Sequence, residues 1–306
     1  MYSKEYDKQV RLLLQCLPLL EKLDRFALKG GTAINFFLKN MPRLSVDIDL
    51  TYLPIESREE TFANMQKDLK KFGNTIQKTV PNSRISMQIA QKTGHVVRLL
   101  VYANGTQIKV EPSFVVRGAL YPPEYLDLCE RAENEFEMSV KNVKTLSSSE
   151  IYAGKICAAL NRQHPRDLFD IYVLLNEQGI TDKIRQAFVV YLAGDARPLH
   201  EMLQPNLLDI EAIYQRQFHR MTMEDITLNE LLTARAKLIK KISEELTLNE
   251  RKFLLSIKLG EPQWDLLPFK NLEQLPSLQW KLINIKKMDK NKHKKMVDKL
   301  KEVLGL

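Results

Sequence analysis

Two glycines and two aspartates near the N-terminus have the types and the spacing that chemistry on a nucleotide requires. Gly30 and Gly31 are followed by the hydroxyl of Thr32, and Asp47 comes sixteen residues after Gly31, with Asp49 two residues later. Glycine lets backbone amides approach phosphate oxygens without a side chain in the way. Carboxylates bind the divalent cations that accompany nucleotides. The pattern therefore predicts phosphoryl-type transfer from a nucleotide with a metal ion.

The segment before the aspartates predicts a strand, a glycine turn and a helix. Residues 26–28 form a short apolar run that the glycines interrupt. Residues 33–38 then read as the start of a helix, for which Thr32 is a suitable N-cap. The first turn of such a helix offers free amides and a positive dipole end to an anion. Pro42 ends this predicted helix.

The aspartates fall in a second predicted strand, over residues 44–50. Apolar residues alternate there with polar ones, which places Asp47 and Asp49 on one face. They are separated by about 6.6 Å along the strand, so both can ligate one ion or share two. A solvated strand face is the competing interpretation. It is less suitable because strands disfavour aspartate and like charges on one face repel each other.

These residues resemble the DNA polymerase β-like nucleotidyltransferase superfamily, whose signature is a glycine pair followed by Asp-hydrophobic-Asp. The finer pattern is similar to the AbiEii/AbiGii toxin-type nucleotidyltransferases of bacterial abortive-infection and toxin–antitoxin systems. Its Arg-x-Ser-x-Asp-hydrophobic-Asp-Leu motif is matched by Arg43, Ser45, Asp47, Asp49 and Leu50. The resemblance is most specific over residues 26–52, looser over 106–113 and 147–176, and weak beyond about residue 200.

Glu111 matches the third carboxylate that the superfamily places on the strand beside the aspartates. It ends a predicted strand over residues 106–111, just before Pro112. The resemblance implies that Glu111 completes a metal site with Asp47 and Asp49 and acts as base on the attacking hydroxyl. An acid at the end of a strand is also an ordinary surface residue, so the competing interpretation is structural.

Two predicted helices over residues 147–176 carry the next polar residues. Ser148 or Ser149 is expected to cap the first helix, which carries Lys155 and Arg162 on one face. The resemblance implies that Lys155 contacts the triphosphate of the nucleotide. A lysine there would also stabilise charge on the transferring group.

The second of these helices begins after His164-Pro165 and carries Asp167 and Asp170 on one face. The resemblance implies that one of the two aspartates orients the base or the acceptor, or holds Lys155 in place. Acids in a first helical turn are also favoured by the helix dipole alone, so a purely structural role is the alternative.

The predicted fold class is α+β: a polymerase β-like nucleotidyltransferase core, with a mixed sheet and flanking helices, followed by a helical C-terminal domain. Asn104-Gly105 lies between two alternating runs and predicts a hairpin. The predicted domains are residues 1–145, the nucleotidyltransferase domain with its N-terminal helix, and residues 146–306, a helical domain completing the cleft. The other predicted elements are helices over residues 5–23 and 59–72 and strands over residues 84–90, 95–102 and 136–143.

Composition limits the remaining interpretations. The chain has 306 residues, and its 44% hydrophobic content argues against a disordered protein. Three scattered cysteines in no metal spacing indicate a reducing compartment. No leader and no apolar run of membrane-spanning length is visible, so a cytoplasmic protein without a membrane partner is expected.

The formal net charge of +8 is concentrated in two helical segments near residues 235–241 and 279–303. A basic face suits an RNA acceptor, since phosphate contacts give affinity without sequence choice. A solvated lysine-rich helix and a docking face for an acidic partner are the alternatives. Trp280 is the only aromatic residue of the last segment, so base stacking is not indicated there.

Together these features predict a nucleotidyltransferase that uses an NTP and Mg²⁺ or Mn²⁺ and releases pyrophosphate. The resemblance adds a toxin role, the tRNA 3′ end or another RNA as acceptor, and a cognate antitoxin protein as partner. A protein-modifying nucleotidyltransferase, a phosphotransferase, and an inactive nucleotide- or RNA-binding module are the alternatives. The predicted nucleotide-binding residues are Gly30, Gly31, Thr32, Arg43, Ser45 and Lys155.

Overall fold

The structure is a computed structural model that describes residues 4–91, 94–219 and 221–306. Its contacts divide the chain into two compact units. Unit 1 holds the described residues up to Ile151 together with residues 221–225. Unit 2 holds Tyr152–His219 and Ile226–Leu306. The functional division predicted at residue 145 stays a prediction.

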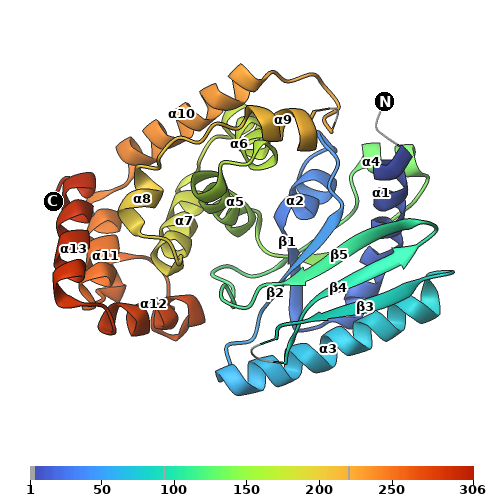
Figure 1. The fold of residues 1–306 in the computed structure, drawn as a ribbon, viewed down its shortest axis with the longest axis horizontal. Coiled ribbons are helices and arrows are strands. Elements are labelled where there is room, and N and C mark those ends of the chain that lie inside the picture. The colour runs from blue at the N-terminus through green and yellow to red at the C-terminus, as the bar shows by residue number, and fades with distance from the viewer. Residues whose placement is uncertain (1–3, 92–93, 220) are drawn as a thin grey trace. The chain divides into compact units, whose positions relative to one another are not determined.

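A mixed sheet forms the centre of unit 1, and the described residues contribute seven strands to it in the order β3-β4-β5-β2-β1-β7-β6 (Figure 1). The pairs β2/β5 and β1/β7 are parallel, and the other neighbours are antiparallel. The strands are β1 (Phe26–Lys29), β2 (Asp47–Tyr52), β3 (Arg84–Ile89), β4 (Val96–Ala103), β5 (Thr106–Pro112), β6 (Glu124–Leu126) and β7 (Val143–Thr145).

Helices cover the apolar side of this sheet. Contacts join α1 (Lys4–Cys16) to β5 and α3 (Arg58–Thr79) to β3 and β4, and Figure 1 shows α3 running along the sheet. Ile48 and Leu50 are fully buried, and alternation along β2 directs them to the side opposite Asp47 and Asp49. The sheet thus separates an apolar side from a polar side that carries the aspartates.

The predicted hairpin between β4 and β5 is confirmed, with Asn104 and Gly105 both at positive φ. The helix predicted over residues 59–72 is longer in the structure, where α3 spans Arg58–Thr79. A capping box of Ser57 and Glu60 forms its start. Gly73 lets the helix continue close to β3.

The strand predicted over residues 136–143 is wrong. Helix α4 (Glu130–Phe136) occupies the start of this stretch and buries Ala132 and Phe136 on one side. Glu137 then adopts a left-handed conformation that ends the helix, and β7 begins only at Val143.

Unit 2 is helical, as predicted. Helix α5 (Ser148–Arg162) enters it, and α6 packs on α10, α11 on α13, and α12 on α7. Side chains of Thr181, Thr227 and Thr247 cap α7, α10 and α11. The helices are α6 (Pro165–Glu177), α7 (Asp182–Gly194), α8 (Leu199–Leu203), α9 (Glu211–Gln217), α10 (Leu228–Glu245), α11 (Leu248–Leu259), α12 (Pro276–Lys286) and α13 (Lys290–Leu304).

The last basic segment consists of two helices, where one was predicted over residues 279–303. The reason is Asp289, whose side chain accepts a hydrogen bond from the Lys292 amide and so starts α13 as a separate helix. No helix in the described part of the chain is long and apolar enough to cross a membrane.

Candidate active site

The glycine turn lies directly against the second aspartate. Gly30 has a φ of 73°, and a Cβ atom there would overlap Oδ2 of Asp49. Only glycine leaves room for this approach and adopts the left-handed conformation without strain. Residues 19 positions apart in the sequence thus form one site in unit 1.

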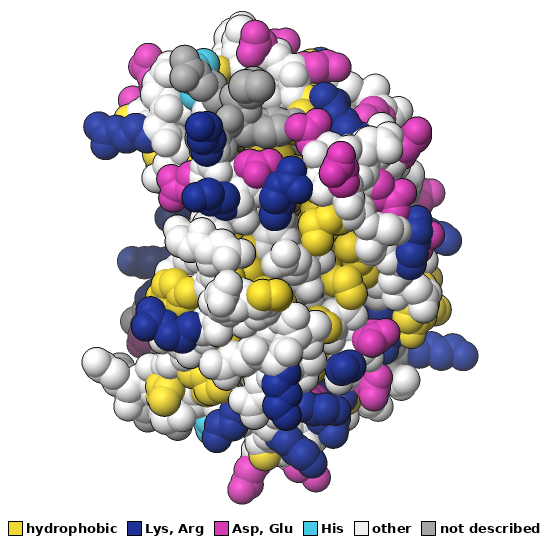
Figure 2. All heavy atoms as spheres, turned by 90° about the vertical axis from the view of Figure 1, so that its right-hand side faces the viewer, with side chains coloured by type: hydrophobic (Ala, Val, Ile, Leu, Met, Phe, Trp, Pro, Cys, Tyr) yellow, Lys and Arg dark blue, Asp and Glu magenta, His cyan; other side chains and the backbone are white. Residues whose placement is uncertain are grey.

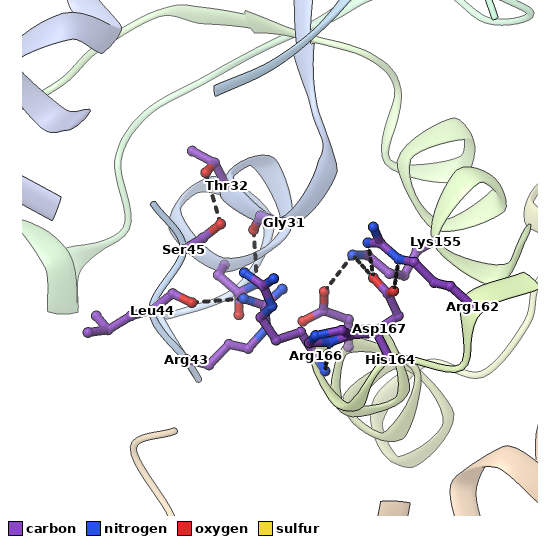
Figure 3. Close-up of polar contacts among 12 residues, drawn as sticks. Gly31, Thr32, Arg43, Leu44, Ser45, Lys155, Arg162, His164, Arg166 and Asp167 are labelled. Carbon is purple, nitrogen blue, oxygen red and sulfur yellow. Dashed lines mark hydrogen bonds and ion pairs between the residues drawn. The ribbon is translucent and has the colours of Figure 1, made fainter. Parts of the chain in front are cut away.

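Thr32 fastens the glycine turn to the strand of the aspartates. Its buried hydroxyl donates to the backbone carbonyl of Asp47 at 2.5 Å and lies 3.0 Å from Oγ of Ser45 (Figure 3). The prediction that Thr32 is an N-cap is wrong, because helix α2 (Gly30–Ala33) already begins at Gly30. The left-handed φ of Gly30 turns the chain into the helix, so Thr32 lies inside its first turn, facing β2.

Arg43 and Ser45 lie over the second glycine. A Cβ on Gly31 would come within 2.8 Å of Nη2 of Arg43 and 3.0 Å of Oγ of Ser45. The guanidinium of Arg43 is buried and donates from Nη1 to the Leu44 carbonyl at 2.8 Å (Figure 3). Three of the predicted nucleotide-binding residues are therefore brought together at one turn.

A distant segment holds this turn in place. The Leu44 amide donates to the Met221 carbonyl, and the Met223 amide donates to the Pro42 carbonyl, both at 2.9 Å. Arg43 and Thr222 form the isolated bridge between these segments. Nothing in the local sequence predicts this pairing, since the two segments lie about 180 residues apart.

Charged residues form a row across the polar side of the sheet. The register places Lys29 of β1 and Glu111 of β5 on either side of Asp49. Glu111 therefore occupies the predicted position beside the aspartates. Its carboxylate forms an ion pair with Arg98 of β4, and both side chains are about one-third exposed.

Lys29 and Arg98 were not among the predicted site residues. Burial lowers the pKa of Lys29, and the charge of Asp49 opposes this shift. Strand register is the signal that would have found both residues, because each is a cation one strand away from a predicted metal ligand. That signal becomes readable only when the strand order is known.

The carboxylates of β2 are donors of the kind that a divalent cation prefers. Asp47 and Asp49 offer hard oxygens on one strand face, and both are partly exposed. Among the described residues, no three carboxylate, imidazole or thiol side chains are placed to hold an ion together. A magnesium site typically uses one or two protein carboxylates and takes its other ligands from water and substrate phosphates. Asp47 and Asp49 therefore suit a bound divalent cation such as Mg²⁺.

A second polar cluster lies in unit 2, where Lys155 of α5 meets both aspartates of α6. Nζ of Lys155 donates to Oδ1 of Asp167 at 2.8 Å and lies 3.0 Å from Oδ2 of Asp170 (Figure 3). Asp167 also accepts from Nε of Arg162 at 2.5 Å. Lys155 is 7% exposed and both aspartates 1%, so the three form a buried ionic group.

Burial alone would raise the pKa of Asp167, but the charges of Lys155 and Arg162 lower it well below its usual range. Asp167 is therefore a firmly ionised carboxylate. A buried ion pair of this kind fixes side-chain positions. Both aspartates contact Lys155, as the last of their three predicted roles requires, and that role stays a prediction.

The caps of these two helices differ in part from the prediction. The cap of α5 is Ser147, and not Ser148 or Ser149. Its hydroxyl oxygen accepts a hydrogen bond from the Glu150 amide at 3.3 Å, and Ser147 directly precedes the helix. At the start of α6, Nδ1 of His164 accepts from the Arg166 amide at 3.1 Å (Figure 3). His164 is thus a helix cap.

The basic residues of the C-terminal half are partly structural. Arg235 is buried and donates to Gln163 and to the Leu208 carbonyl. Lys281 donates to the carbonyl oxygens of Asp195 and Arg197. Both cations are therefore used in hydrogen bonds within the protein.

A basic groove that was not predicted lies along α3 in unit 1. Figure 2 shows Lys and Arg side chains gathered on the lower part of one face, at the level where α3 lies in Figure 1. The groove encloses about 440 Å³ and is lined by Lys67, Lys70, Lys71, Asn74, Thr75 and Lys78. Helical spacing brings its lysines onto one side of α3.

Comparison with known proteins identifies the family. The family model "Nucleotidyl transferase AbiEii toxin, Type IV TA system" matches residues 11–283. Among solved structures, the chain is similar to MenT4, a nucleotidyltransferase toxin from Mycobacterium tuberculosis H37Rv, with a TM-score of 0.62. The match covers 99% of this chain and 94% of that one at 16% sequence identity, which establishes a shared fold. No curated protein matches significantly.

The predicted fold class is confirmed by this likeness and by the mixed sheet followed by helices. The family model covers most of the chain, including the stretches that carried the resemblance. The chain therefore belongs to the AbiEii nucleotidyltransferase toxins of type IV toxin–antitoxin systems.

Proposed function

We propose that this toxin transfers a nucleotide from an NTP to an acceptor hydroxyl and releases pyrophosphate. The observation that carries the proposal is the contact between Gly30 and the Asp49 carboxylate. A phosphate-binding turn and a pair of metal-binding carboxylates must lie side by side for this chemistry.

In this proposal Asp47 and Asp49, joined by Glu111, hold Mg²⁺ or Mn²⁺. The bound ion would neutralise charge on the phosphates and on the leaving pyrophosphate. Glu111 is free to take part only after it leaves Arg98. Such a partly exposed ion pair is weak enough to open when a ligand competes for it.

The turn around Gly31 is proposed to bind the triphosphate. Amides at the start of α2 present their N–H groups and the positive end of the helix dipole to phosphate oxygens. Arg43 and Ser45 add a guanidinium and a hydroxyl beside the same glycine. Thr32 positions the turn through the Asp47 carbonyl.

Lys155 stays the predicted phosphate ligand by resemblance. Its contacts with Asp167 and Asp170 support a lysine that is held in a fixed position. Fixed charge stabilises a transition state better than mobile charge, because no reorganisation is needed when the reaction occurs.

The acceptor is proposed to be a nucleic acid, and the partner an antitoxin protein. The lysines along α3 suit a nucleic-acid acceptor, which supports RNA and, by the family, the tRNA 3′ end. A cognate antitoxin and a cytoplasmic location follow from the family's biology and from the sequence, and both stay predictions.

Induction of the wild type, Asp49→Ala and Glu135→Ala in a bacterial host tests the proposal. Glu135 is an exposed acid of α4 and serves as the matched control. We expect growth arrest from the wild type and from Glu135→Ala and none from Asp49→Ala. Arrest by Asp49→Ala at equal protein levels would contradict a catalytic toxin.

Labelling separates the remaining alternatives. RNA and protein extracts are incubated with the enzyme and either α- or γ-labelled NTPs. Label from the α-phosphate in RNA is the expected result. The same label in protein would identify a protein-modifying enzyme, and label from the γ-phosphate would identify a phosphotransferase.

A further inference from the structure

Each carboxylate that is proposed to bind metal has a cation on a neighbouring strand of the sheet. Two of the cations are register partners of their acids, and the third forms an ion pair with its acid. The pairs are Asp47 with Lys109, Asp49 with Lys29, and Glu111 with Arg98. Register partners lie about 5 Å apart and direct their side chains to the same side of a sheet. The formal charges of these acids and cations therefore cancel.

Burial along the strands agrees with the direction of the two lysines. Ile48 and Val110 pair across β2 and β5, and both are fully buried on the apolar side. Lys109 precedes Val110, so it points to the polar side, where it is partly exposed. Leu28 of β1 is also fully buried, which places Lys29 on the polar side in the same way.

The two lysines differ from Arg98, which is already bound to Glu111. In the part of the chain that the structure describes, no carboxylate lies within ion-pair distance of Lys29 or Lys109. Each lysine is near enough to an aspartate to offset its charge, but no direct contact holds the ammonium. Both ammonium groups therefore remain available to an anionic ligand.

A free divalent cation and its complex with a triphosphate interact differently with such a site. The lysines repel a free cation and so oppose its attraction to the aspartates. A cation that arrives with a triphosphate can bind the aspartates while the phosphate oxygens contact the ammonium groups. The long stem of a lysine lets its ammonium reach past the carboxylate of a neighbouring aspartate.

We propose that Lys29 and Lys109 are phosphate-binding residues that make the site select a metal–triphosphate complex over the free cation. The inference rests on the proposed function, because both lysines act beside the proposed metal ligands. β1 and β5 lie on opposite sides of β2, so the lysines flank the aspartates from both sides. Lys29 also directly precedes Gly30, whose contact with Asp49 places it at the proposed phosphate-binding turn.

Equilibrium dialysis of the full chain tests the inference without turnover. The probes are Mn²⁺ alone and Mn²⁺ with inorganic tripolyphosphate, which has no base and so requires no knowledge of the nucleotide. The wild type should bind the complex at least about tenfold more tightly than free Mn²⁺, since only the complex uses the lysines as well as the aspartates. Equal affinity for the two probes would overturn the proposed selection.

Substitution of either lysine should change the two affinities in opposite directions. Lys29→Met should bind free Mn²⁺ about threefold more tightly than the wild type, because a repelling charge is removed. It should bind the complex about tenfold more weakly, because a phosphate ligand is lost. Lys109→Met should show the same two changes. Loss of a merely structural lysine would weaken both affinities and lower the melting temperature, and that result would overturn the inference.

Three further variants serve as controls. Lys29→Arg keeps the charge and should bind both probes nearly as the wild type does. Lys8→Met removes an exposed lysine of α1 and should leave both affinities unchanged. Asp49→Ala removes a proposed metal ligand and should weaken the binding of both probes.

The outcomes separate this inference from the proposed function. Equal affinity of the wild type, Lys29→Met and Lys109→Met for the complex would overturn the role of the lysines. The proposed function would stand in that case, provided that Asp49→Ala still weakens binding. A wild type that binds neither probe would overturn the proposed metal site and this inference together.

Discussion

The two pairs of aspartates in this toxin look alike in sequence and differ in environment. Asp47 and Asp49 lie on a strand face and are partly exposed beside a glycine turn. Asp167 and Asp170 lie on one helix face, are almost fully buried, and surround Lys155. The open pair can take up a ligand, whereas the buried pair is already used to position a lysine. Burial and partners, and not spacing, therefore distinguish the two pairs, and they are the reason why metal binding is proposed for the first pair only.

The largest effect is expected at the open pair. Asp49→Ala should lower nucleotide transfer at least about 10⁴-fold, because it removes a charge that supports several kcal/mol of transition-state stabilisation. The free energy of unfolding should change by less than about 1 kcal/mol, since Asp49 is partly exposed. Single-turnover assays and urea denaturation measure the two quantities. A large loss of stability would place Asp49 with the buried pair.

The buried pair should show a large loss of stability. Asp167→Asn leaves the Lys155 ammonium buried with one carboxylate, and we expect a loss of about 3 kcal/mol in the free energy of unfolding. Asp182→Asn is the matched control, because Asp182 forms an exposed ion pair with Arg185 and should cost less than about 1 kcal/mol. Equal losses in the two variants would remove the distinction between the pairs.

Acid should destabilise the protein through Asp167. Its folded-state pKa is lower than its unfolded-state pKa, since Lys155 and Arg162 outweigh the opposing effect of burial. The stabilisation is therefore complete above the ordinary aspartate pKa of about 4, and it is lost as the pH falls below that value. Between pH 5 and pH 2, the free energy of unfolding should fall by roughly 1–3 kcal/mol less in Asp167→Asn than in the wild type. Urea denaturation at each pH measures this difference. An equal fall in the free energy of unfolding of both proteins would contradict the role given to Asp167.

Gly30 and Gly105 offer a test of the close approach at the open pair. Both have a φ of 73°, but a Cβ on Gly105 meets nothing within 4 Å, whereas one on Gly30 meets Asp49. Gly105→Ala should cost about 1 kcal/mol of stability from backbone strain alone and leave activity unchanged. Gly30→Ala should cost about 2 kcal/mol and also lower activity, because Asp49 must move. Similar activity in both variants would show that the contact is irrelevant.

The smallest effect is expected at Arg98. Arg98→Gln releases Glu111, and we expect the apparent affinity for the metal ion to rise by about threefold to tenfold, since a partly exposed pair is worth about 1 kcal/mol. Titration of activity with Mg²⁺ measures this change. A weaker response to Mg²⁺ would mean that Arg98 holds Glu111 in its working position.

The sequence alone predicted the family, the α+β class, and the glycine and aspartate residues of the candidate site. This was possible because turn chemistry and strand alternation are local, and the motif lies within about 25 residues. The same local patterns misled at residues 136–143, where helix α4 ends at Phe136 and the next strand begins only at Val143. They also misled at Thr32, whose hydroxyl bonds to the Asp47 carbonyl on β2 and does not cap a helix.

Tertiary structure decided which of the acids are partly exposed and which are buried. Strand order brought Lys29 and Arg98 into the row of Asp49 and Glu111, and the segment at residues 221–223 fastened the Arg43 turn. Neither relation has a local signal, because strand order and long-range backbone pairing depend on how the whole chain folds. The residue types set which chemistry was available, and the packing of distant segments determined where charges remain accessible to a substrate.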